Sequence, residues 1–231
     1  MTTTSEQPPS PTSDSSEGRY SYDQSYEFLR RSVAKSRNPV QKAKDAVRTF
    51  RDIFFALKLR PGDSVLDVGC NIGTEGHYLQ MAGIRAYGVD VNFAALKVGR
   101  EKYSLDKHNW LVQAAATGLP FADASIDYVV SQDIFEHFQD EGEARAVFRE
   151  MARICKGNRM AHKITVLEDK EWIDNDPSHR IKEPARWWAR FFRSQGWRVM
   201  RNPEQKRISL AGGFRKRTLR YGFFLIEKSQ G

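Results

Sequence analysis

Apolar and polar residues alternate along the middle of the chain in a pattern that predicts short buried strands separated by amphipathic helices. Apolar runs typical of strands occur at about residues 63–68, 85–90, 109–113, 125–131 and 160–167. Helical periodicity fills the intervals at about residues 74–82, 93–103 and 141–155. Because strands that alternate with helices form parallel sheets covered on both faces, we expect an α/β fold of the doubly wound type.

The chain that precedes this pattern has a different composition. Residues 1–18 are rich in Ser, Thr, Pro and Glu and contain no apolar stretch, which predicts a disordered tail and no secretory signal. Residues 19–60 show helical periodicity with a break near Asn38-Pro39, so we expect an N-terminal helical segment of one or two helices. Residues 61–231 then form the main domain.

The C-terminal part of that domain begins with a long polar loop at about residues 168–182. A helix to about Ser194 and a strand at residues 197–200 follow, and Tyr221 to Glu227 has the pattern of a closing strand. Turn residues lie between these last two strands, which suits an antiparallel hairpin at an edge of the sheet.

The first strand ends in a glycine turn with acidic neighbours. Gly69 and Gly73 lack a Cβ and Asn71 tolerates a positive φ, so the backbone can pass closely under a ligand before a helix begins. Asp67 precedes this turn and Glu75 follows it, so a pyrophosphate would be repelled here. The sequence therefore predicts a ligand with a cationic end at the carboxyl edge of the sheet.

This stretch resembles the first motif of the class I S-adenosylmethionine-dependent methyltransferases, whose ligand carries a sulfonium and an α-ammonium group. The resemblance continues in order through residues 86–90, 119–131 and 132–138, and it spans roughly residues 60–170. It implies a Rossmann-like, seven-stranded, mostly parallel sheet with an antiparallel C-terminal edge strand, together with N-terminal helices.

The resemblance also implies which residues hold the cofactor. Asp90 ends the second strand 21 residues after Gly69, a distance that suits an acid on the two ribose hydroxyls. Ala115 and Ala116 would frame the adenine through backbone groups, and Ala115 stands where many relatives have an acid. Gln132 would lie beside the transferred methyl group. The methionine end would contact four residues of the first motif, namely Asp67, Gly69, Asn71 and Gly73.

Histidine is the side chain best suited to assist the loss of a hydroxyl proton near neutral pH. His137 follows the fourth strand at its carboxyl end, and His179 lies in the polar loop that could fold over the site. We therefore expect His137 and His179 to be the catalytic candidates. The other three histidines, His77, His108 and His162, are interpreted as structural or surface residues, with His162 placed at the start of the fifth strand.

A second interpretation of the segment around His137 is a metal site. Asp133, Glu136 and His137 have the spacing that brings three ligands onto one helical face. The segment is similar to the metal-ligating pattern of ubiquinone-biosynthesis O-methyltransferases, which implies Mg²⁺ as a possible cofactor. Such an ion would lower the pKa of an acceptor hydroxyl in place of a base, or together with one.

Composition narrows the class of protein. The chain has 231 residues, enough for one domain with a substantial core, and no apolar run approaches the roughly 20 residues of a membrane span. Cys70 and Cys155 are too few for a disulfide framework and lack metal-ligand spacing. We therefore expect a cytoplasmic enzyme without membrane contact, and the sequence does not indicate its oligomeric state.

The net charge of +8 is concentrated near the C-terminus, where thirteen Lys and Arg lie between Arg180 and Arg220 against Glu183 and Glu204. Two interpretations stay open: a solvated face, or a field that attracts an anionic acceptor or nucleic acid. The basic residues are spread over several elements and no nucleic-acid-binding module is recognisable, which favours the first.

These observations predict S-adenosylmethionine-dependent methylation of a small molecule at a hydroxyl, with a saccharide or natural product as acceptor. The polar loop at residues 168–182 is similar to the acceptor region of small-molecule methyltransferases and suits a polyhydroxylated or anionic acceptor. One alternative is a nucleic-acid methyltransferase that uses the basic C-terminal third, but no Asn-Pro-Pro-Tyr-type motif is present. The other alternative is a non-catalytic protein that binds the cofactor and assists a partner.

Overall fold

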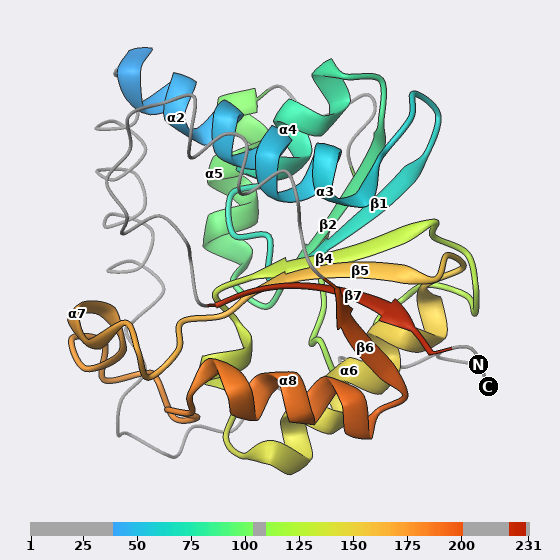
Figure 1. Ribbon diagram of the computed structural model, residues 1–231. Coiled ribbons are helices and arrows are strands. Elements are labelled where there is room, and N and C mark those ends of the chain that lie inside the picture. The colour runs from blue at the N-terminus through green and yellow to red at the C-terminus, as the bar shows by residue number, and fades with distance from the viewer. Residues whose placement is uncertain (1–38, 104–109, 201–221, 230–231) are drawn as a thin grey trace, which may run out of the picture.

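The computed structural model describes residues 39–103, 110–200 and 222–229, and these form a sheet between two layers of helices (Figure 1). The sheet has seven strands in the order β3-β2-β1-β4-β5-β7-β6. The strands are β1 Ser64–Val68, β2 Arg85–Asp90, β3 Trp110–Gln113, β4 Tyr128–Gln132, β5 Arg159–Lys163, β6 Trp197–Met200 and β7 Phe223–Lys228. The predicted tail, residues 19–38 of the predicted helical segment, His108 and the turn before β7 lie outside the described residues.

The fold predicted from the sequence is confirmed, and the C-terminal strand adds one detail. Strands β1 to β5 are parallel, whereas β7 runs antiparallel to both β5 and β6. It therefore lies one position inside the sheet, and β6 forms the edge. Glu227 of β7 pairs across both neighbours, with Arg159 of β5 at 3.0 Å and with Arg198 of β6.

The fifth strand ends earlier than the apolar pattern suggested. β5 stops at Lys163. The N–H of Ile164 still donates to the carbonyl of Gly222, the next residue in the β5–β7 register, but the N–H of Thr165 leaves the ladder and donates to the Glu136 carboxylate. His162 is thus near the carboxyl end of β5, and its predicted position at the start of the strand is wrong.

The helices form two layers (Figure 1). One face of the sheet is covered by α2 Pro39–Thr49, the π-helical turn η1 Phe50–Phe54, α3 Phe55–Leu57, α4 Thr74–Met81 and α5 Phe93–Tyr103. The other face is covered by α6 Glu141–Ile154 and α8 Ala185–Ser194. Two short elements, the 3₁₀ turn η2 Phe135–His137 and α7 Lys170–Ile173, lie in the connections after β4 and β5. Pro39 opens α2, as expected for a residue whose fixed φ suits the first helical position.

Each central strand contributes side chains to both hydrophobic layers. On β1, Val65 packs into the cluster with Ile53 and Leu57, while Leu66 packs into the cluster beneath α6 and α8. The same division separates Val130 from Val129, Ala161 from Met160 and Leu225 from Ile226. Burial on both faces is the expected environment of parallel strands, and the parallel direction of β1 to β5 places their carboxyl ends at one edge of the sheet. None of the helices in the described ranges is long and apolar enough to cross a membrane.

Candidate active site

The predicted glycine turn forms between β1 and α4 and passes close to the segment after β4. Gly69, Asn71 and Gly73 all have positive φ angles, of 77°, 51° and 73°. A Cβ added to Gly69 would lie only 2.1 Å from Cγ2 of Ile134. The turn thus requires glycine at position 69 for its backbone conformation and for its contact with the β4 connection.

Asp67, the acid before the turn, is buried and incompletely bonded. Its side-chain oxygen Oδ1 has no hydrogen-bond partner among the described residues. Burial raises the pKa of the Asp67 carboxyl well above its usual range, and the carboxylates of Glu75 and Asp90 raise it further, while Arg48 lowers it. A site where acids gather with an orphaned oxygen favours a cationic ligand, as the sequence predicted.

Asp90 lies at the carboxyl end of β2 and joins two backbone segments. Its carboxylate accepts the N–H of Asn71 at 2.7 Å and the N–H of Asn92 at 2.8 Å. Burial raises the pKa of Asp90, and these hydrogen bonds partly oppose that effect. The carboxylate oxygens can accept further hydrogen bonds, so contact with the ribose hydroxyls is possible, and this contact stays a prediction.

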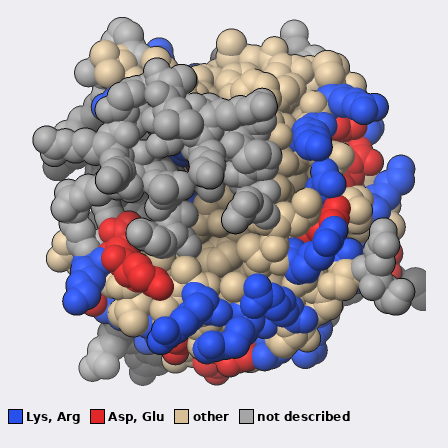
Figure 2. Space-filling model, in the orientation of Figure 1, with Lys and Arg blue, Asp and Glu red and all other residues tan. Residues whose placement is uncertain are grey.

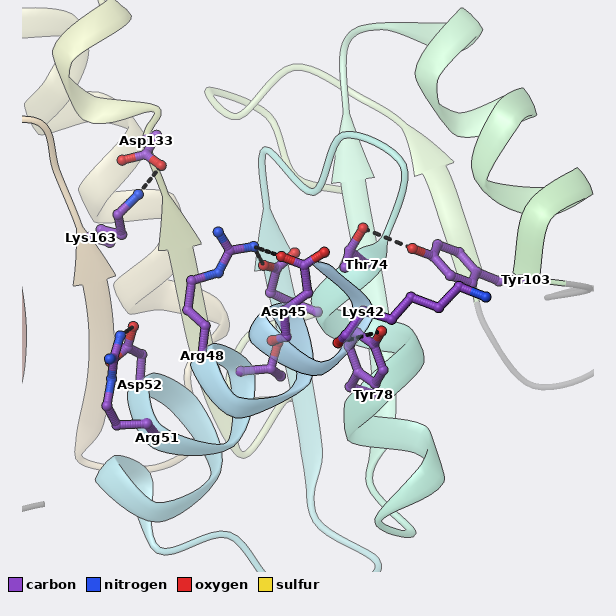
Figure 3. Close-up of polar contacts among 12 residues, drawn as sticks. Lys42, Asp45, Arg48, Arg51, Asp52, Thr74, Tyr78, Tyr103, Asp133 and Lys163 are labelled. Atoms are coloured by element: carbon purple, nitrogen blue, oxygen red, sulfur yellow. Dashed lines mark hydrogen bonds and ion pairs between the residues drawn. The ribbon is translucent and has the colours of Figure 1, made fainter. Parts of the chain in front are cut away.

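Arg48 of α2 reaches this acidic group from the N-terminal helices (Figure 3). Its Nη2 atom lies 3.0 Å from Oε1 of Glu75 on α4 and 3.5 Å from Oδ1 of Asp45. Its Nε atom is buried without a hydrogen-bond partner. Sequence reasoning missed Arg48, because its place depends on the packing of α2 against α4 and no local motif marks it.

The remaining predicted cofactor residues lie after β3 and at the end of β4. Ala115 is exposed and its carbonyl accepts the N–H of Gly118 at 3.1 Å, while Ala116 is half-buried beside it. Gln132 is the last residue of β4, and its Nε2 donor is buried without a partner. An unused amide donor at this edge is available to a ligand.

The connection after β4 does not form the single helical face expected for Asp133, Glu136 and His137. Asp133 has a φ of 52° and precedes the 3₁₀ turn, which begins only at Phe135. Its carboxylate is ion-paired with Lys163 of β5 (Figure 3). The predicted metal set is therefore corrected: among the described residues, the group able to hold a metal is Glu136, His137 and His179.

The two predicted catalytic histidines come together. The centroids of the His137 and His179 rings are 4.7 Å apart. The backbone carbonyl of Glu136 accepts the N–H groups of Arg180 and Ile181 at 2.8 and 3.0 Å, which holds the loop after α7 against η2. Residues from two distant parts of the sequence thus form one polar cluster beyond the carboxyl end of β4.

His162 and His77 belong to other environments. His162 is fully buried, stacks on Phe192 and shares a hydrogen bond of 2.9 Å with the hydroxyl of Ser131. Burial lowers the pKa of His162 to about 3, so the ring is neutral and serves the core. His77 stacks on Tyr103 with ring centroids 4.3 Å apart. Both histidines therefore have structural roles, as the sequence analysis expected.

Comparison with known proteins places these features in a family context. A family profile described as a methyltransferase domain matches residues 66–159. The methyltransferase GfsG of Streptomyces halstedii is 30% identical over 156 residues, which are 61% of this chain and 54% of that protein. The botryococcene C-methyltransferase of Botryococcus braunii is 27% identical over 127 residues, or 53% of this chain and 33% of that protein. The chain thus spans about half or less of the length of these relatives.

Solved structures share the fold at lower sequence identity. A complex between the Haloferax volcanii Trm112 methyltransferase activator and a methyltransferase contains a chain that matches with a TM-score of 0.63 at 17% identity. That match covers 93% of this chain and 100% of the other. Phosphoethanolamine N-methyltransferase 2 of Haemonchus contortus, in complex with S-adenosyl-L-methionine, matches with a TM-score of 0.57 at 18% identity, over 79% of this chain and 52% of that one.

Proposed function

We propose that this chain, which belongs to the class I S-adenosylmethionine-dependent methyltransferases, transfers the cofactor's methyl group to a hydroxyl of a small-molecule acceptor. The observation that carries this proposal is the cluster of His137 and His179 beyond the carboxyl end of β4. Parallel α/β sheets bind their ligands at that edge, and the cluster lies after the same strand that ends in Gln132.

The residues at the glycine turn fit S-adenosylmethionine. The orphaned Oδ1 of Asp67 and the surrounding carboxylates suit an ammonium group, and Gly69 and Gly73 allow close approach of the backbone. Asp90 keeps acceptor capacity for ribose hydroxyls, and Gln132 has a free donor. When bound, the cofactor supplies an electrophilic methyl group and a good leaving group, so the protein has to position the acceptor and assist deprotonation.

The two imidazoles support oxygen as the methylated atom. A hydroxyl has to lose its proton as the new O–CH₃ bond forms, and His137 and His179 are groups at this edge that can assist the loss. Relatives and structural neighbours include C- and N-methyltransferases, so the atom is part of the proposal and not of the family assignment.

The neighbouring loop supports a polar small-molecule acceptor. Asp174, Asp176 and Ser178 precede His179, and Asp176 is about half exposed. Carboxylates and hydroxyls of this kind can bind the hydroxyl groups of a saccharide or of an oxygenated natural product. We propose such a molecule as the acceptor and expect neither nucleic acid nor a membrane as partner.

The basic residues give less support to a nucleic-acid acceptor. Arg186, Arg190 and Arg193 are exposed along α8, and Lys and Arg side chains gather over this helix in Figure 2. This stripe covers the outer side of the α6 and α8 layer rather than the glycine turn. The exposure of these three arginines is consistent with the solvated face that the sequence analysis favoured, while the basic residues at 201–220 lie outside the described part of the chain. Such a stripe can also raise the local concentration of an anionic acceptor.

The proposal is tested in two stages with purified protein. S-adenosylhomocysteine binding is measured by calorimetry for the native chain and for Asp67→Asn, with Asp123→Asn as an exposed control. A panel of saccharides, phenols, amines and oligonucleotides is then screened with methyl-labelled S-adenosylmethionine. We expect cofactor binding that Asp67→Asn weakens, and labelling among the hydroxyl acceptors. Labelling confined to amines or oligonucleotides would contradict the hydroxyl proposal.

A further inference from the structure

Glu136, His137 and His179 offer three ligand atoms that all lie within 4.8 Å of one another. They come from two places in the fold, η2 after β4 and the loop after α7. Glu136 is fully buried, and His179 is only 9% exposed. His137 is half-buried, so two of the three ligands are buried, and the cluster differs from the exposed acidic patches that occur on most protein surfaces.

The buried Glu136 carboxylate has one oxygen in use and one oxygen without a partner. Oε1 accepts the backbone N–H of Thr165 at 2.8 Å, whereas Oε2 is buried and makes no hydrogen bond. In the described part of the chain, Glu136 has no ion pair, and Lys163 of β5 pairs with Asp133. A buried carboxylate oxygen is costly unless a proton or a cation satisfies it.

The His179 ring is held so that one nitrogen stays available. Its Nδ1 atom lies 3.2 Å from the carbonyl of Ile173, and a carbonyl can only accept, so Nδ1 carries the hydrogen. The neutral ring then has its lone pair on Nε2. A backbone carbonyl that fixes the tautomer of a histidine in this way is a common outer partner of metal-binding histidines.

The His137 ring is fixed in the same sense by a short chain of hydrogen bonds. The hydroxyl of Ser178 has a single hydrogen, and its bond to the Asp176 carboxylate uses it. Its oxygen therefore accepts from Nδ1 of His137, 3.0 Å away, which leaves the lone pair of His137 on Nε2. Asp176 also approaches Nε2 of His179 at 3.9 Å, so this carboxylate adds negative charge beside the cluster.

We infer that Glu136, His137 and His179 bind one divalent cation of the Zn²⁺ or Co²⁺ type. Two imidazoles and one carboxylate suit these borderline metals better than Mg²⁺, which prefers oxygen ligands. Three protein ligands leave a coordination position for water or for a substrate oxygen. This inference rests on the proposed function for its use: the acceptor hydroxyl would take that position, where the cation lowers its pKa. In the metal-bound state the two imidazoles would act as ligands in place of proton acceptors, and the hydroxyl proton would leave to water.

The test measures metal binding directly, on untagged full-length protein freed of metal with a chelator. Calorimetry with Zn²⁺ and the visible absorption of added Co²⁺ are recorded for the native chain, Glu136→Gln and His179→Ala. His77→Ala, a histidine that stacks on Tyr103 away from the cluster, is the matched control. We expect one Zn²⁺ per chain, and at least about a hundredfold weaker binding in the two cluster variants, since loss of an outer partner alone costs up to that much.

The results of these experiments distinguish failure of the metal-site inference from failure of the proposed function. Stabilisation of each variant by S-adenosylhomocysteine shows that it is folded, and if Glu136→Gln does not fold, His137→Ala replaces it. Absence of stoichiometric binding in the native chain, or binding unchanged in the cluster variants, overturns the inference. Hydroxyl methylation by metal-free protein that binds no Zn²⁺ would leave the proposed function standing alone. Specific metal binding without methylation of any hydroxyl acceptor would leave the metal site standing and remove the proposed function.

Discussion

Replacing Gly69 by Ala tests whether the glycine turn is shaped by backbone conformation, by close packing or by both. The φ of 77° at Gly69 is unfavourable for alanine by about 1–2 kcal/mol. The new Cβ would stand 2.1 Å from Cγ2 of Ile134, whereas an ordinary carbon–carbon contact needs about 3.5 Å, so one segment has to move by about 1.4 Å. Overpacking of this kind costs about 1–3 kcal/mol, which gives a total of about 2–5 kcal/mol.

Two other glycines provide matched controls for the separate contributions. Gly62 has a φ of 93° with nothing within 4 Å of its added Cβ, so Gly62→Ala carries the conformational cost alone. Gly118 has open space and no positive φ, so Gly118→Ala is expected to change stability by less than about 1 kcal/mol. Unfolding in urea gives the free energy for each variant.

The double variant Gly69→Ala, Ile134→Ala completes the test. Ile134→Ala removes the Cγ2 atom that the new Cβ would meet. The double variant should therefore lose less stability than the two single variants together, by the packing contribution of about 1–3 kcal/mol, and this difference is the coupling energy between the two sites. Gly69→Ala should also weaken binding of S-adenosylhomocysteine, because the proposed site has the methionine end above this turn. A loss of stability for Gly69→Ala no larger than that for Gly62→Ala would refute the packing argument.

Three further predictions follow from the site and its surroundings. Asp90→Ala should weaken S-adenosylhomocysteine binding about ten- to a hundredfold by calorimetry, since charge-assisted bonds are worth about 1.5–3 kcal/mol; an unchanged Kd would place the ribose elsewhere. His137→Ala should lower turnover roughly 10²–10⁴-fold in single-turnover assays while cofactor affinity persists, and full activity would exclude His137 from catalysis. Ser64→Ala should cost about 1 kcal/mol near pH 7 in urea unfolding. The variant loses the hydroxyl donor that lowers the pKa of Asp127 against the opposing effect of burial, but it keeps the backbone N–H donor, and solvent screens the carboxylate. A lowered folded-state pKa stabilises above the unfolded value of about 4 and is lost as pH falls through the folded value, so the difference between native and variant should shrink below about pH 4; a difference independent of pH would contradict this.

The sequence predicted those parts of the fold and site that depend on local patterns. The strand and helix order, the glycine turn at Gly69 and Asp67 at the end of β1 follow from apolar runs and residue types that act over a few positions. The end of β5 could not be predicted, because it depends on the hydrogen bond from Thr165 to Glu136, which is remote in sequence.

The missed features of the site share the same cause. Arg48 reaches Glu75 only because α2 packs on α4. The Asp133 carboxylate forms an ion pair with Lys163 of the adjacent strand, so it does not join the predicted metal ligands. The sequence analysis placed His179 in a loop that could fold over the site, but its contact with His137 depends on backbone hydrogen bonds from that loop to Glu136. Each of these features depends on a contact between segments that are distant in sequence, and the spacing of residues within one segment does not predict such a contact.

The interior position of β7 has a consequence for the order of folding. The strand that separates β5 from β6 comes after both of them in the chain, and its first pair with β5 joins residues 60 positions apart, Lys163 and Phe223. Until β7 has been synthesised, β5 exposes an unpaired edge and β6 has no neighbour in the sheet, and open edges of this kind promote association with other chains. Glu227, between Arg159 and Arg198, then allows one alignment of the three strands, since a slip by one residue would turn its charge to the opposite face. Strand β7, the last strand of the sheet to be synthesised, thus carries the Glu227 carboxylate whose ion pairs select the final register.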